Sequence, residues 1–170
     1  MKYCIANWKM NMNHHQADSY IEKLYGLMCE QKDSNDTLMI LCPPYTLLDF
    51  IWYNEMFIAM SNEEMLISTP QLGVQNINPN NEGAYTGEIS PTMIKSYCDG
   101  EWEPMGFVAN WAIIGHSERR ALFHESNVKF SRREKFFSEL SSTFGLLQAL
   151  FTNPSILPYF SIKSCAFFLI

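Results

Sequence analysis

Short apolar runs alternate with amphipathic stretches along much of the chain. Each run has the length of a strand that is buried on both faces, and the pattern predicts strands at 3–8, 37–42, 72–76 and 107–114. Helical spacing or a helix-start signal predicts helices at 14–31, from near Leu47, from Ser90-Pro91 and from near Ser117. Strands that alternate with helices in this way are typical of α/β folds with a parallel sheet.

The first of these helices has an N-terminal signal in the sequence. Asn13 lies where a polar N-cap residue is expected, and Gln16 follows it with the spacing of a capping box. In a capping box, each of the two side chains binds the backbone N–H of the other residue. We therefore expect the helix to begin at residue 14.

The composition excludes several classes of protein. The chain has 170 residues, of which 47% are hydrophobic and 18% charged, so we expect a folded core. A formal charge of −6 argues against a nucleic-acid partner. No apolar run reaches the roughly 18 residues of a membrane span, and Asn7 and Lys9 come too early for a signal peptide. We therefore expect a cytoplasmic protein with no membrane partner.

The five cysteines are widely spaced and form no C-x-x-C pair. This pattern is typical of free thiols in a reducing compartment and predicts no zinc site. Nothing else in the sequence indicates a metal or a cofactor, so we expect the protein to use none.

Asn7 and Lys9 are the first candidate functional residues. They lie two positions apart at the end of the first predicted strand, so both side chains are expected on one face. A lysine at the carboxyl end of a buried strand is costly unless it meets an anion or opens onto a cleft. The alternative is a lysine that extends from the end of the sheet into solvent.

His116 is the second candidate, because it follows the fourth predicted strand and precedes a helix. The helix dipole disfavours an imidazolium there, and a neutral imidazole can donate a hydrogen bond to a carbonyl. The alternative is a structural histidine, and Glu118 has the similar alternative of a salt bridge to the arginines beside it. Since parallel strands end on one rim, we expect Asn7, Lys9 and His116 to lie together.

Four segments, in the correct order, resemble motifs of the triosephosphate isomerase family. These are Asn7-Trp8-Lys9-Met10-Asn11, then Pro43-Pro44-Tyr45-Thr46, then Gly73-Val74-Gln75-Asn76 with the loop Gly83–Ser90, and finally Ile113–Arg120. The resemblance implies an α/β fold of the (β/α)8 TIM-barrel family, here a partial barrel of about four β/α units. It also implies interconversion of dihydroxyacetone phosphate and glyceraldehyde 3-phosphate by proton transfer through an enediolate, in glycolysis and gluconeogenesis.

The resemblance assigns catalytic roles at the rim. It implies that Lys9 binds the substrate anion and that Asn7 orients Lys9 and the substrate. It implies that His116 is the neutral electrophile which polarises the carbonyl. It also places Glu118 beside Lys9, and Ser117 at the start of the helix.

Further roles follow from the same resemblance. Glu88 and Arg119 are expected to form a supporting ion pair. Met10 and Thr86 are expected at the contact between two subunits of a homodimer.

The sequence also departs from the family. The motifs match to about residue 129, so we expect 1–130 to form the N-terminal half of a barrel and 131–170 to be an unmatched apolar tail. The tail is either not native to the fold or covers the open inner face of the half-barrel. The stretches 52–66 and 101–109 resemble insertions. The family's general base, a glutamate in a lid motif, and its glycine-rich phosphate loops have no matching string in the 170 residues.

Without a general base, the chain alone is expected to be an inactive or impaired isomerase. Two alternatives remain at this point. One is a non-catalytic fragment that pairs with a full-length isomerase through the loop at 78–90, as a mixed dimer. The other is a truncated, nonproductive gene product.

Overall fold

The computed structural model describes residues 2–30, 37–61, 70–95, 109–126 and 145–148. The strands are β1 (Lys2–Asn7), β2 (Thr37–Cys42), β3 (Gln71–Val74), β4 (Ala109–Ile114) and β5 (Gly145–Gln148). The helices are α1 (His14–Glu30), α2 (Tyr45–Ser61), α3 (Pro91–Lys95) and α4 (Ser117–Leu122). The four predicted strands and the four predicted helix starts are confirmed, to within a few residues at each end.

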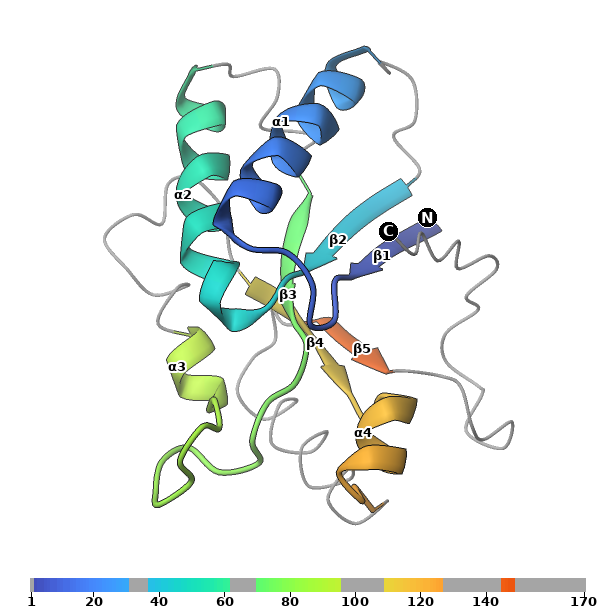
Figure 1. Ribbon diagram of the computed structural model, residues 1–170, viewed down its shortest axis with the longest axis vertical. Coiled ribbons are helices and arrows are strands. Elements are labelled where there is room, and N and C mark those ends of the chain that lie inside the picture. The colour runs from blue at the N-terminus through green and yellow to red at the C-terminus, as the bar shows by residue number, and fades with distance from the viewer. Residues whose placement is uncertain (1, 31–36, 62–69, 96–108, 127–144, 149–170) are drawn as a thin grey trace.

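The strands form one parallel sheet in the order β1-β2-β3-β4-β5. Each strand therefore pairs with the next strand along the chain, and helices connect the first four. Figure 1 shows α1 and α2 side by side on one face of this sheet, where the two helices are in contact. This succession is a partial β/α barrel, and its parallel strands all end at the same rim.

The capping box at the start of α1 is confirmed. The backbone N–H of Asn13 donates to Gln16 Oε1 at 2.9 Å, and the backbone N–H of Gln16 donates to Asn13 Oδ1 at 3.0 Å. These bonds satisfy two donors that the first helical turn leaves without a partner, so α1 begins at residue 14. The capping box also fixes where the loop between β1 and α1 ends.

The strand β5 was not predicted. It pairs with β4 in parallel, with Trp111 beside Gly145 and Ile114 beside Gln148, and it lies in the segment predicted as an unmatched tail. Its four residues include only two large apolar side chains, and periodicity cannot distinguish so short a run from other structure. The sheet therefore extends beyond residue 130. Residues 52–61 of the first suspected insertion continue α2. The remainder of that stretch, 62–66, lies outside the described residues, as do 101–108 of the second and the rest of 131–170.

The sheet has an apolar core on each face. Leu41 packs with α1 and α2 on the outer face, whereas its neighbours Ile40 and Cys42 point to the inner face, where Ile113 joins them. Tyr3 and Trp111 come from β1 and β4, yet their rings meet with centroids 5.8 Å apart above this inner core. Strands that are separated by two others can meet only if the sheet is strongly curved.

Cys42 is fully buried in the inner core, and burial raises the pKa of its thiol to about 12. The thiol is therefore protonated at neutral pH, and its sulfur acts as a packing group. Within the described residues Cys4 and Cys42 are both free, as the cysteine spacing predicts. No helix among those described is long and apolar enough to cross a bilayer.

Gly73 is required by the close packing of the inner face. A Cβ atom added there would lie 2.7 Å from Cys42 Sγ and 3.1 Å from Trp111 Cβ. Both neighbours are themselves held in the sheet, so neither can move away without cost.

We expect Gly73→Ala to lower the free energy of unfolding by about 1–3 kcal/mol through overpacking. The measurement is urea denaturation of the full chain. Gly26→Ala is the control, because Gly26 lies in α1 with nothing within 4 Å of the added Cβ. It should raise stability by about 0.5–1 kcal/mol through helix propensity. Equal effects of the two substitutions would contradict the packing described here.

Candidate active site

Lys9 lies just beyond β1, at the rim, in a backbone conformation that is unusual for a lysine. Its φ is 54°, in the left-handed region that glycine favours. Its backbone N–H donates to Asn7 Oδ1 at 3.0 Å. Its ammonium donates to Glu118 Oε1 at 2.7 Å, across 109 positions of sequence. Lys9 therefore joins the end of β1 to the start of α4.

His116 is the N-cap residue of α4 and follows β4 by two positions. Its Nδ1 accepts a hydrogen bond from the backbone N–H of Glu118 at 3.3 Å. A nitrogen that accepts a hydrogen bond carries no proton, so this contact leaves Nε2 as the ring nitrogen that can donate. Glu118 Oε2 lies farther from the same nitrogen, at 3.5 Å, and interacts with it only as a neighbouring charge.

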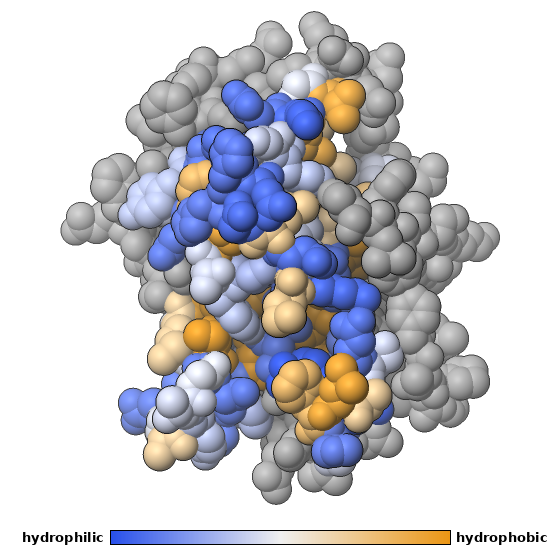
Figure 2. Space-filling model, in the orientation of Figure 1, coloured by the Kyte–Doolittle hydropathy of each residue, from blue (hydrophilic) through white to orange (hydrophobic). Residues whose placement is uncertain are grey.

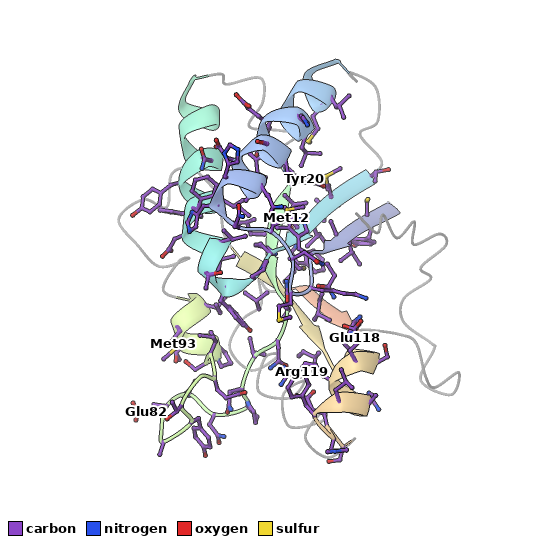
Figure 3. The ribbon with its side chains drawn as sticks, viewed as in Figure 1. Met12, Tyr20, Glu82, Met93, Glu118 and Arg119 are labelled. Atoms are coloured by element: carbon purple, nitrogen blue, oxygen red, sulfur yellow. The ribbon has the colours of Figure 1, made fainter. Side chains whose placement is uncertain are left out.

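Glu118 connects Lys9 and His116 at the rim. The hydrogen bond from Lys9 holds the pKa of the Glu118 carboxyl below its usual value. Partial burial opposes this effect, and the positive charge of Lys9 supports it. The side chain of Glu118 is 47% exposed, so water screens the ion pair and its contribution to stability is small. Figure 3 shows Glu118 and its neighbour Arg119 on α4.

The expected ion pair between Glu88 and Arg119 is not formed. Arg119 Nε instead donates to Glu125 Oε1 at 2.7 Å, and its guanidinium lies over the ring of Phe123. Glu125 is buried and requires a cation beside it, and Arg119, six residues earlier in α4, supplies one. Glu88 accepts a hydrogen bond from Asn78 Nδ2 at 3.0 Å, within its own loop.

The remaining predicted residues are at the surface. Ser117 and Thr86 are exposed, and Met10 is 96% exposed. Exposed apolar side chains also occur on α4, where Leu122 and Phe123 are 72% and 61% exposed. Figure 2 shows hydrophobic surface in the lower part of the view, where α3 and α4 lie.

Gln75 is a residue of the rim that the sequence patterns did not identify as functional. Its Nε2 donates to the main-chain carbonyls of Lys9 at 2.8 Å and Cys42 at 2.9 Å. The available signal was its position immediately after β3, on the same rim as Asn7 and His116. In the described part of the chain, no group of histidine, cysteine, aspartate and glutamate side chains could hold a metal ion.

This arrangement of parallel β/α units, with polar side chains gathered beyond the strand ends, defines the class of β/α-barrel proteins. A model of the triosephosphate isomerase family matches residues 2–143, farther than the motifs alone indicate. The chain belongs to the triosephosphate isomerase family.

Curated relatives support this assignment. The chain is 35% identical over 135 residues to "Triosephosphate isomerase" of Dictyoglomus turgidum, covering 79% of this chain and 45% of the relative. It is 35% identical over 136 residues to "Triosephosphate isomerase" of Lawsonia intracellularis, covering 79% of this chain and 45% of the relative. For Trichodesmium erythraeum the identity is 33% over 130 residues, 76% of this chain and 45% of the relative. The chain spans less than half the length of these relatives.

We expect Lys9→Met to raise the pKa of Glu118 toward the ordinary glutamate value of about 4.3, because the hydrogen bond that lowers it is lost. The pKa can be followed by ¹³C NMR of the Glu118 carboxyl. Since the folded-state pKa is lowered, the pair stabilises the fold at neutral pH, and this stabilisation is lost as the pH falls through the lowered pKa.

Lys23→Met, at an exposed position of α1, is the control and should leave the titration of Glu118 unchanged. An unchanged Glu118 titration in Lys9→Met would contradict the contact.

Proposed function

We propose that this chain supplies the carbonyl- and anion-binding part of a triosephosphate isomerase active site. The observation that carries the proposal is the meeting of Lys9, Glu118 and His116 at one rim, from segments 109 positions apart. The family relationship supports dihydroxyacetone phosphate and glyceraldehyde 3-phosphate as the two substrates.

The reaction removes a proton from the hydroxyl-bearing carbon next to the carbonyl and adds a proton to the former carbonyl carbon, so that the carbonyl moves to the neighbouring carbon. The intermediate is an enediolate that carries negative charge. His116 donates from Nε2 to the carbonyl oxygen, which is the proton position that its Nδ1 contact favours. Lys9 balances the negative charge of the phosphate and of the enediolate. An ammonium has three N–H donors, and one of them is bonded to Glu118, so Lys9 can bind the substrate without first leaving Glu118.

Asn7 acts on Lys9 in this scheme. Its Oδ1 accepts a hydrogen bond from the backbone N–H of Lys9. This hydrogen bond fixes the backbone position of Lys9 just beyond the end of β1. The whole assembly is built on strand ends and one helix start, which are rigid supports for a catalytic group.

In the 170 residues, no string matches the lid motif that carries the family's general base. Proton removal needs a carboxylate within hydrogen-bond reach of the substrate carbon. Glu118 is the carboxylate bonded to Lys9, and the ammonium lowers its affinity for protons. We therefore propose that the chain alone is an impaired isomerase, lacking a contribution of about 10²–10⁴-fold. With this function we associate a cytoplasmic location, glycolysis and gluconeogenesis, on the strength of the family relationship.

The test is a coupled isomerase assay on the purified full chain, together with its affinity for dihydroxyacetone phosphate. We expect binding with turnover far below that of a full-length relative. His116→Gln should abolish the residual turnover, and Lys9→Met should weaken binding about tenfold or more, because a charged hydrogen bond is lost. Lys23→Met should leave both unchanged. Binding that is equal in Lys9→Met and in the unmodified chain would exclude the proposed role of Lys9.

A second candidate function is a non-catalytic subunit that forms a mixed dimer with a full-length isomerase. Met10 is 96% exposed, more than any other of the exposed large apolar side chains in the described residues, and it is therefore the one that a partner would bury most fully. The loop at 78–90 is closed at its base by the backbone N–H of Asn78, which donates to Ile89 O at 2.8 Å, and it exposes Tyr85 and Thr86. We propose Met10 and Thr86 as contacts in a homodimer or in this mixed dimer.

Size-exclusion chromatography of the chain with a full-length relative tests this candidate. We expect a mixed species that Met10→Asp abolishes, because the charge would be buried in the contact. Leu27→Asp, at an exposed apolar position of α1, is the matched control and should leave the mixed species intact. Separate elution of the two unmodified proteins would exclude the mixed dimer.

A further inference from the structure

The backbone of Lys9 is in a conformation that the lysine itself does not favour. At a φ of 54°, its Cβ crowds the following carbonyl oxygen, and residues other than glycine rarely adopt this region. Such a conformation persists only where the surrounding structure imposes it. The contacts that impose it therefore also decide where the ammonium of Lys9 lies.

Two amide side chains hold the two polar backbone groups of Lys9. Asn7 accepts its N–H, and Gln75 donates to its carbonyl at 2.8 Å. Asn7 is two residues away and moves with the same segment. Gln75 is 66 positions away, at the end of β3 on the far side of β2. Its position therefore does not depend on the conformation of the segment that carries Lys9.

The amide of Gln75 is itself fixed. Its second N–H donates to the carbonyl of Cys42 at 2.9 Å, and the same carbonyl accepts the backbone N–H of Trp8 at 3.1 Å. Cys42 is the fully buried last residue of β2. Both donors of the amide nitrogen are thus used, and the ends of three neighbouring strands are tied together by one side chain.

We propose that Gln75 is a positioning residue which holds Lys9 in its left-handed backbone conformation and so directs the lysine ammonium at the substrate. That the ammonium is directed at the substrate rests on the proposed function. That Gln75 maintains the contact between Lys9 and Glu118 does not depend on the proposed function. If the amide donors are removed, Lys9 is free to return to an ordinary backbone conformation, and its ammonium leaves Glu118.

Gln75→Met tests the proposal, because methionine matches glutamine in length and has no donor. The primary readout is the pKa of the Glu118 carboxyl, measured by ¹³C NMR in the full chain. We expect Gln75→Met to move this pKa by at least half of the shift that Lys9→Met produces. A second readout is the dissociation constant for dihydroxyacetone phosphate, which should rise about tenfold.

Asn54→Leu is the matched control. Asn54 also donates from its side-chain amide to a main-chain carbonyl at 2.8 Å, that of Phe50, but within α2 and away from the rim. We expect it to alter stability and to leave the titration of Glu118 and the affinity for dihydroxyacetone phosphate unchanged. A merely structural role for Gln75 would give the same pattern as this control.

The outcomes separate the two proposals. A folded Gln75→Met chain with the Glu118 pKa of the unmodified protein overturns the role of Gln75. If the unmodified chain binds no triose phosphate, the proposed function fails, while the Glu118 titration still decides the positioning role.

If Gln75→Met does not fold, Gln75→Asn, which keeps the amide one methylene shorter, takes its place under the same criteria. If neither folds, through-hydrogen-bond couplings from the Gln75 amide protons to the Lys9 carbonyl are measured in the unmodified chain. The presence of these couplings supports the proposal, and their absence overturns it.

Discussion

Parallel pairing of the strands is the constraint on which the whole site depends. In this sheet every strand lies beside its neighbour in sequence, so the residues that follow β1, β3 and β4 all reach the same rim. A lysine, a glutamine and a histidine that are far apart in the sequence are brought together for this reason alone. Curvature then brings the rim residues closer, as the contact between Tyr3 and Trp111 across the inner face indicates.

The positions of the rim side chains are fixed by a series of contacts, in which each residue holds the next one in place. Buried Cys42 gives a fixed carbonyl, Gln75 binds that carbonyl and the carbonyl of Lys9, and Lys9 reaches Glu118. At the other end, the backbone N–H of Glu118 orients the imidazole of His116. Strain in the backbone of Lys9 is tolerated because the neighbouring amides hold it, which is characteristic of functional sites.

Much of this arrangement could be predicted from local patterns in the sequence. The apolar runs predicted the strands, and the capping box at Asn13 predicted the start of α1. The period of a strand does not account for Lys9, because β1 ends at Asn7 and the backbone of Lys9 is left-handed. What local patterns could not give were contacts that depend on side-chain reach. Arg119 pairs with Glu125 and not with Glu88, because the chain turns after α4 and brings the Glu125 carboxylate to 2.7 Å from Arg119 Nε. Gln75 is an ordinary polar residue in the sequence, and its importance comes from two carbonyls on other strands.

The central claim is that Lys9 and His116 act on one bound triose phosphate. The most direct test is an NMR titration of the full chain with dihydroxyacetone phosphate, in which the Lys9 ammonium and the His116 imidazole are observed together. Binding at a single site predicts that both signals shift with one saturation curve. Signals that saturate at different concentrations, or a shift of only one of them, would contradict the shared site.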